Sequence, residues 1–410
     1  MKKFLLFLFL VNLIKFIPAG LEYLPLQDDF IQYWGYGERS MSYLAYEVGF
    51  FNTRPFAGLM DIFFWGRFWG GLLFASVIIT LLHFFSLIIL LKAFENTGIK
   101  PGGIFCAVYM LLPAGFEAVY WLSASTRIVT GMFFLSLAAY AAGSKKIPSW
   151  LFFYTDIIAF GFYEQTAAVC FILCLWIAAR QKRRGILAYN IAAAALMCIY
   201  YKVMAGTGGL ADRTGLHFAP SLTLGALAKS AYASLRLFFI GNPLGTGLFM
   251  ITGFGAFSLY RNSENTGREK LYIGALLFIS AFAVHFATGA GYIPFRCVYP
   301  AVTGLALITE YTAESCRSGR AFLGIFTALS VASNAYQAQV FSETGRFNIQ
   351  VCTDTRIEDG VVVRTERKEL DLGLDEWYRN YVIEDITQSG WAMTGAVRAW
   401  HRDINLKIGE

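Results

Sequence analysis

The chain has 410 residues, of which 56% are hydrophobic and only 15% are charged. A soluble domain of this length would need far more polar surface, so the composition excludes an ordinary water-soluble globular protein. The net charge of +6 indicates basic cytoplasmic loops between membrane helices rather than nucleic-acid binding. Apolar runs such as residues 71–91 reach the roughly 20 residues that a membrane helix needs. We therefore expect an all-α polytopic membrane protein.

The first twenty residues, MKKFLLFLFLVNLIKFIPAG, resemble a secretory signal peptide. They lack a convincing small-x-small cleavage site, and many more apolar segments follow. We expect a retained first helix that is inserted with Lys2 and Lys3 on the inside.

Eleven apolar segments are expected to cross the membrane: 4–20, 68–91, 102–121, 126–143, 148–162, 165–180, 186–204, 243–260, 271–288, 297–312 and 321–340. Basic patches lie between them: Lys2/Lys3, Lys92 to Lys100, Lys145/Lys146, Arg180 to Arg184, Arg261 to Lys270, and Arg317 to Arg320. If these patches face the cytoplasm, every helix alternates in direction, as the positive-inside rule requires.

Residues 147–180 test this count, because they contain no obvious loop. One continuous helix of that length would measure about 50 Å, against a hydrocarbon core of about 30 Å. A single crossing would also separate the basic residues 144–146 from 180–184. We expect two short crossings that turn near Gly161.

The longer polar segments then fall outside: 21–67, 205–242, 289–296 and 341–410. Aromatic residues in 29–50 indicate a helix in the membrane interface, which serves either as an anchor or as a ligand platform. Residues 1–340 would form the membrane domain, and 341–410 a small extracytoplasmic α/β appendage. In that appendage FNIQVCTD and GVVVRTER alternate around Glu358-Asp359-Gly360, which predicts a β-hairpin.

Ionisable residues near the outer surface form one set on this topology. Such residues are costly at the membrane and are functional candidates by default. They are Asp28, Asp29, Glu117, Arg127, Glu164, Lys202, His285 and Arg296. A carboxylate in the set can take the proton of an attacking hydroxyl, and the cations can hold a phosphate leaving group. Transfer of a sugar from a lipid-linked donor needs both at the membrane surface.

Several short motifs resemble those of the GT-C fold glycosyltransferases, which use polyprenyl-phosphate-linked sugars. The acidic pair follows the first helix in a long outer loop, and YWLSASTR (120–127) resembles the aromatic outer turn after the third helix of bacterial members. FYEQT (162–166) resembles their glutamate-bearing turn, and FRCVYP (295–300) a late arginine-tyrosine-proline stretch. The resemblance is nearest to bacterial enzymes that glucosylate O-antigen or other surface polysaccharides. The chain departs from the large protein mannosyltransferases and oligosaccharyltransferases in its short outer loops and tail and its lack of DxD.

The resemblance implies a hexosyltransferase in the bacterial cytoplasmic membrane, active on the periplasmic or exterior side, with a glycan or lipid acceptor. We expect Asp28 or Asp29 to be the general base, with Asp28 preferred. Donor phosphate contacts are expected from Arg296, Arg127, Lys202 and Tyr299, which lies three residues after Arg296 on the same helical face. Substrate contacts are expected from Glu164, Glu117 and Trp121. Glu164 would orient the acceptor or hold a cation such as Arg127.

Other readings stay open. A transporter or flippase of lipid-linked saccharides would show internal repeats and broken helices near the midplane, and the sequence has no repeat. A polysaccharide polymerase would use the same outer site. Arg39, Arg54 and Arg67 would bind lipid headgroups without chemistry, and Lys202 and Arg296 could likewise snorkel.

Metal binding is not assigned by the sequence. No cofactor is certain, and a divalent metal at Asp28 and Asp29 is left open because two adjacent acids make an incomplete site. Cys106, Cys170 and Cys174 lie in apolar helical stretches without metal-ligand spacing and are expected to be small buried hydrophobes. Asp156 lies mid-helix, where it would pair with a base or stay protonated.

Overall fold

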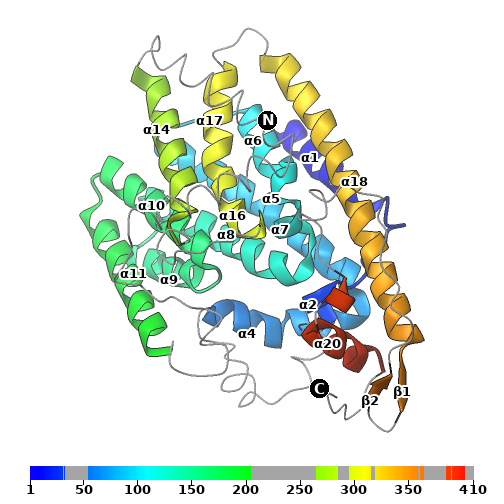
Figure 1. Ribbon diagram of the computed structural model, residues 1–410. Coiled ribbons are helices and arrows are strands. Elements are labelled where there is room, and N and C mark those ends of the chain that lie inside the picture. Colours follow the sequence, from blue (N-terminus) through cyan, green and yellow to red (C-terminus); the bar gives the residue numbers. More distant parts are fainter. Residues whose placement is uncertain are drawn as a thin grey trace, which may run out of the picture.

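The computed structural model describes residues 1–30, 32, 54–204, 265–284, 295–314, 319–358, 361–363, 385–388 and 390–401. This part of the chain is mostly helical (Figure 1). The expected interface stretch 33–50, the loop 205–242, the span 243–260 and His285 lie outside the described residues.

The helices of the N-terminal half follow one another closely. They are α1 (Lys2–Asn12), η1 (Leu13–Phe16), α2 (Gln27–Phe30), α4 (Pro55–Phe63), η4 (Trp65–Gly71), α5 (Leu72–Asn96), α6 (Gly103–Leu111), η5 (Pro113–Gly115), α7 (Phe116–Tyr120), α8 (Leu122–Gly143), α9 (Ser149–Phe160), α10 (Glu164–Arg180) and α11 (Arg184–Met204). The later elements are α14 (Asn265–Ser280), α16 (Phe295–Val298), η6 (Tyr299–Ala301), α17 (Val302–Glu314), α18 (Gly319–Asp354), β1 (Arg356–Glu358), β2 (Val361–Val363), η7 (Ile386–Gln388) and α20 (Gly390–His401).

Three described helical stretches are long and apolar enough to cross a membrane. They are Trp65–Asn96, Leu122–Gly143 and Arg184–Met204. The other expected spans, where the structure describes them, form helices that are shorter or less apolar, such as α9 with 12 residues and α10 with 17 residues.

The segment 102–121 is not the single helix expected from its hydropathy. Helix α6 ends at Leu111, and Leu112 is non-helical with φ −57° and ψ 115°. The ring of Pro113 disfavours a helical conformation in the residue before it, which explains this break. The chain turns again at Trp121, with ψ 116°, and α8 begins at Leu122. As a result, a new helix, α8, begins inside the protein, and its N-terminus lies in the interior.

Residues 147–180 form two helices, as predicted. Helices α9 and α10 are joined by the turn Gly161–Tyr163. Arg183, just beyond α10, donates from Nη1 to the carbonyl oxygens of Ala142 at 2.7 Å and Ser144 at 2.8 Å. The end of α10 therefore lies beside the end of α8, so 144–146 and 180–184 share one end of the bundle.

Further contacts gather at that same end. Arg180 Nε donates to the carbonyl oxygen of Thr97 at 2.6 Å. Glu310 accepts from Lys270 Nζ at 3.2 Å and from the backbone N–H of Gly102 at 2.6 Å. Four of the segments predicted to face inward, around residues 92–100, 144–146, 180–184 and 261–270, thus meet at one end, which we call the basic end.

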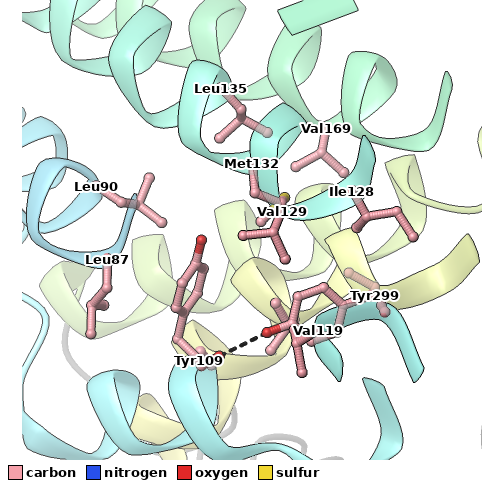
Figure 2. Close-up of a cluster of buried hydrophobic side chains, with 14 of the residues drawn as sticks. Leu87, Leu90, Tyr109, Val119, Ile128, Val129, Met132, Leu135, Val169 and Tyr299 are labelled. Carbon is pink, nitrogen blue, oxygen red and sulfur yellow. Dashed lines mark hydrogen bonds between the residues drawn. The ribbon is translucent and has the colours of Figure 1, made fainter. Parts of the chain in front are cut away.

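Helix α8 is the centre of the apolar core. Ile128, Val129, Met132 and Leu135 on α8 pack toward Leu87 and Leu90 of α5, Tyr109 of α6 and Val169 of α10 (Figure 2). In contrast, large apolar side chains on peripheral helices are exposed. Examples are Phe7 and Leu10 on α1, Phe74 on α5, and Ile199 and Val203 on α11, each at least half exposed.

The C-terminal region differs from the expected appendage. Helix α18 has 36 residues and runs past the boundary expected at 340. Strands β1 and β2 pair antiparallel, with Ile357 opposite Val362, so the hairpin forms. However, the predicted strand FNIQVCTD (347–354) is the end of α18. A short alternating run cannot reveal that a helix already in progress continues through it.

Helix α20 packs against α2 (Figure 1). Phe30 of α2 is buried against Ala392, Met393 and Ala396 of α20. Helix α20 is thereby brought beside the acidic pair at Asp28 and Asp29.

Candidate functional site

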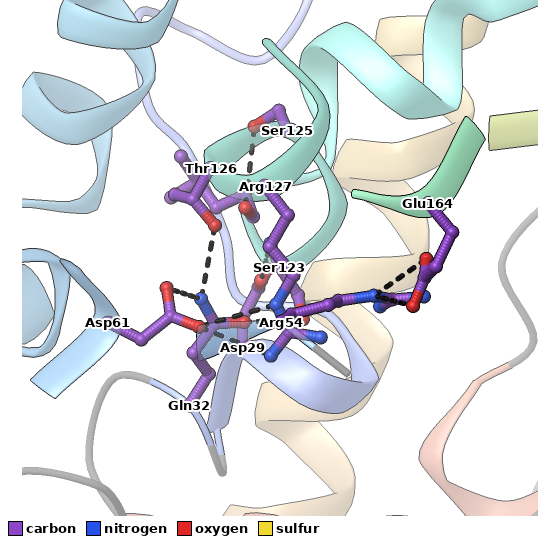
Figure 3. Close-up of polar contacts among 10 residues, drawn as sticks. Asp29, Gln32, Arg54, Asp61, Ser123, Ser125, Thr126, Arg127 and Glu164 are labelled. Atoms are coloured by element: carbon purple, nitrogen blue, oxygen red, sulfur yellow. Dashed lines mark hydrogen bonds and ion pairs between the residues drawn. The ribbon is translucent and has the colours of Figure 1, made fainter. Parts of the chain in front are cut away.

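The polar cluster consists of Asp29, Gln32, Arg54, Asp61, Ser123, Thr126, Arg127 and Glu164 (Figure 3). It lies where α8 and α10 begin, next to α2 and α4. Helix α8 has 22 residues, or about 33 Å of length. The cluster is therefore separated from the basic end by about the thickness of a bilayer core.

Close packing of α4 on the turn between α9 and α10 builds this end. The N–H of Phe56 donates to the carbonyl oxygen of Gly161 at 3.1 Å. A Cβ atom at Gly161 would lie 2.3 Å from Cδ2 of the Phe56 ring, so only glycine permits this approach. The contact places Arg54, just before α4, next to the start of α10.

Asp29 is fully buried and tied to three donors. Its carboxylate accepts from Tyr23 Oη at 2.7 Å, from the Leu26 N–H at 3.0 Å and from the Ser123 N–H at 2.8 Å. Ser123 is in the first turn of α8, so the carboxylate meets the positive end of the helix dipole. Burial raises the pKa of Asp29 to about 7, although the hydrogen bonds oppose that rise.

Gln32 joins this helix terminus to Asp61 of α4. Its Nε2 donates to Asp61 Oδ1 at 2.7 Å and to Thr126 Oγ1 at 3.1 Å, while its Oε1 accepts from Ser123 Oγ at 2.6 Å. The other oxygen of Asp61 pairs with Arg127 Nη2 at 3.2 Å. Burial raises the pKa of Asp61 to about 6, and the charge of Arg127 opposes this.

Glu164 forms an ion pair with Arg54, whose Nε–H is shared between the two carboxylate oxygens. Arg54 Nε lies 3.0 Å from Oε1 and 3.1 Å from Oε2, and the guanidinium lies 4.4 Å from the centre of the Tyr163 ring. Arg127, the expected partner, pairs with Asp61 of α4 instead. Arg54 is therefore not merely a ligand for lipid headgroups.

Arg296 of α16 meets two other predicted site residues. It forms an ion pair with Glu117 of α7, and its guanidinium lies 4.9 Å from the centre of the Trp121 ring. The next residue, Cys297, lies 3.0 Å from the hydroxyl of Tyr163, whose ring stacks on Arg54. Tyr163 thus contacts both Arg54 and Cys297, the residue that follows Arg296.

The structure does not place Tyr299 beside Arg296 as expected. Tyr299 is buried in the core, where its hydroxyl bonds with His83 Nε2 at 2.8 Å and donates to the carbonyl oxygen of Tyr109 at 3.1 Å (Figure 2). Its ring packs against Gly115, where the lack of a side chain leaves room for it.

The remaining predicted residues lie at the margin of the polar cluster. Asp28 is half-buried beside the fully buried Asp29. Lys202 is exposed on the last turn of α11. Its neighbour Tyr201 donates to the carbonyl oxygen of Phe160 at 3.0 Å, so this turn lies beside the end of α9.

Sequence reasoning missed Tyr23, Gln32 and Asp61. Asp61 could have been found, because it interrupts the apolar run FAGLMDIFFW, just as Glu164 interrupts its own segment. Tyr23 and Gln32 carried no such signal, since a tyrosine and a glutamine are ordinary in a loop at the membrane surface.

The arrangement provides two half-exposed guanidinium groups held by acids, a half-buried carboxylate at Asp28, and a rigid helix terminus. Such a set can bind an anionic oxygen group and accept a proton. No protein-family model matches the chain, and neither a curated protein nor a solved structure is significantly similar to it. The likeness to GT-C enzymes therefore rests on the short motifs alone.

Proposed function

We propose that this chain is an integral-membrane glycosyltransferase that moves a hexose from a polyprenyl-phosphate to a cell-surface glycan or lipid. The observation that carries the proposal is the grouping of three acid–arginine pairs, Asp61–Arg127, Glu164–Arg54 and Glu117–Arg296, opposite the basic end. About eleven crossings of the bacterial cytoplasmic membrane would place this group on the outer side, where a lipid-linked sugar presents its phosphate.

Membrane insertion is supported by the surface of the bundle. The exposed apolar side chains of α1, α5 and α11 make an outer surface that water would not favour and that lipid tails would cover. The buried charges of the polar cluster face the protein interior, as expected for ionisable groups at membrane depth.

The donor phosphate would lie between Arg296 and Arg54. Their side chains are 34% and 29% exposed, so both are accessible from the outer side. A guanidinium offers several N–H donors in one plane, which suits a phosphate oxygen pair. Glu117 and Glu164 would hold the two guanidinium groups in place before the donor arrives, and the Trp121 ring contacts the Arg296 guanidinium.

Asp28 would act as the general base. Asp29 is fully buried and uses both carboxylate oxygens for protein hydrogen bonds, whereas Asp28 retains exposed surface. The role of Asp29 would be to fix the backbone of α2 against α8, and thereby to position Asp28. The acceptor hydroxyl would lose its proton to Asp28 as it attacks the sugar, and the phosphate would leave toward the arginines.

The test is transfer in proteoliposomes from a radiolabelled polyprenyl-phosphate hexose to extracted cell-envelope acceptor. An enzyme releases polyprenyl phosphate in step with labelled product, whereas a flippase moves the donor across the bilayer unchanged. Asp28→Asn should lower the rate by about 100-fold or more. Glu22→Gln, an exposed acid in the same loop, is the matched control and should transfer normally. Donor movement without product would reject the enzyme in favour of the transporter.

A further inference from the structure

A second group of reactive side chains lies away from the polar cluster, between α9 and α10. One ligand atom each from Asp156, Cys170 and Cys174 falls within 4.8 Å of the others, and all three residues are buried. Cys170 and Cys174 are four residues apart on α10, so they share one face of that helix. Asp156 comes from α9, which packs against α10.

The distances agree with tetrahedral coordination of a metal ion. Zinc–sulfur and zinc–oxygen bonds of about 2.3 and 2.1 Å at the tetrahedral angle separate the two ligand atoms by about 3.6 Å. Cys170 Sγ lies 3.4 Å from Asp156 Oδ1. In the absence of an ion the Cys170 thiol donates to this oxygen, and the separation of the two atoms is close to that of two ligands on one ion.

The protein contacts of Asp156, Cys170 and Cys174 leave one buried carboxyl oxygen without a hydrogen bond. Asp156 Oδ2 is buried and has no hydrogen-bond partner in the described part of the chain. A buried carboxyl oxygen without a partner is unfavourable, and native proteins rarely leave one so. A cation between the carboxylate and the two sulfurs would satisfy it.

We propose that Asp156, Cys170 and Cys174 form a binding site for a divalent d¹⁰ cation, Zn²⁺ by preference. Two sulfur ligands favour such a borderline-soft ion over Mg²⁺ or Ca²⁺, which prefer oxygen ligands. Metal-bound sulfur and carboxyl ligands are deprotonated. Binding one M²⁺ to the fully protonated, neutral site therefore releases three protons to solvent and leaves a net charge of −1 on the bound site.

Such an ion would link two short helices, α9 and α10, through ligands from both. Helix α9 has 12 residues and α10 has 17 residues, so neither is stabilised by length. The turn that joins them leads directly into Glu164, the partner of Arg54. The site is independent of the proposed glycosyl transfer, because it uses none of the residues assigned to that reaction.

The experiment uses the full-length chain in detergent, stripped with a chelator and titrated with Cd²⁺ as the probe. We expect one ion per chain, an ultraviolet sulfur-to-cadmium charge-transfer band, three protons released per ion, and a rise in melting temperature. Cys170→Ser, Cys174→Ser and Asp156→Asn should each weaken Cd²⁺ binding by about 100-fold or more. Cys106→Ser is the matched control, a thiol that is equally buried but on α6, and should bind Cd²⁺ like wild type.

The wild-type chain decides the outcome even where a variant does not fold. Absence of the charge-transfer band at saturating Cd²⁺ would overturn the proposal. So would a band of equal intensity in a well-folded Cys170→Ser/Cys174→Ser double variant, since the sulfur ligands would then lie elsewhere.

Discussion

Asp28 and Asp29 are adjacent, yet their substitution should have opposite consequences. Asp29→Ala removes the acceptor of three buried donors: Tyr23 Oη, the Leu26 N–H and the Ser123 N–H. Each donor left without a partner costs about 1–3 kcal/mol. Allowing for relaxation and water entry, we expect a loss of about 3–6 kcal/mol in the free energy of unfolding, or about 3–7 °C in melting temperature.

Asp29→Asn provides an intermediate case. One amide oxygen can still accept from Tyr23 and Leu26, which share Oδ2 of the native carboxylate. The amide nitrogen would then face the Ser123 N–H, donor against donor. The expected loss is about 1–3 kcal/mol, the value for one unsatisfied buried group.

Asp28→Asn should leave the melting temperature within about 2 °C of wild type, because the substitution keeps the shape of a partly exposed side chain. Its transfer rate should nevertheless fall by about 100-fold or more. The assay pairs a thermal melt of the purified protein in detergent with initial transfer rates at saturating donor. The reasoning fails if Asp29→Ala melts like wild type. It fails equally if Asp28→Asn turns over normally, which would place the base elsewhere.

Four further predictions concern pH, the two exposed arginines and topology. Burial raises the pKa of Asp29 to about 7 from an ordinary value of 3.8, so the folded state binds the proton more tightly than the unfolded state does. Stability should therefore fall as pH rises from about 4 to 7, and melting curves of Asp29→Asn should show a shallower decline; a steeper one would contradict this. Arg54→Ala leaves Glu164 unpaired and should cost about 1–3 kcal/mol, with partial recovery in the charge-swapped pair Arg54→Glu/Glu164→Arg; a double-mutant cycle with zero coupling would show that the ion pair is unimportant. Arg296→Lys keeps the charge but loses the planar fork, so the donor KM should rise clearly, and Arg296→Ala should nearly abolish transfer at normal protein abundance. Wild-type donor affinity in the alanine variant would move the phosphate role to another cation. Since α20 packs on α2 beside the proposed outer site, a reporter fused after Glu410 should be active only outside the cytoplasm, and cytoplasmic activity would show that the number of crossings is wrong.

Local features of this protein followed from the sequence. The length and charge of residues 147–180 predicted two helices that turn near Gly161, and the structure has α9 and α10 there. The basic segments were expected to share one side, and Arg183 indeed caps the end of α8. These features depend on residues close together in the chain, where hydropathy, helix length and charge act directly.

The break at Leu112 also has a local cause, because Pro113 disfavours a helical conformation in the residue before it. We nevertheless expected a single helix there, because the whole segment 102–121 is apolar. The strand expected over 347–354 failed for the opposite reason. Its alternating pattern was too short to outweigh a helix that had already begun 28 residues earlier, at Gly319.

Only the tertiary structure decided which charged group meets which. Arg54 and Glu164 are 110 residues apart, and Arg296 and Glu117 are 179 residues apart. The sequence offers several cations as partners for each acid. The packing of α4 on the turn at Gly161 brings Arg54 to Glu164. Asp29 and Asp156 likewise look alike as acids near or within apolar segments. Asp29 is buried at the N-terminus of α8, whereas Asp156 is buried beside two cysteine sulfur atoms. Their chemistry differs because desolvation and neighbouring dipoles depend on distances in the folded protein, which sequence spacing does not encode.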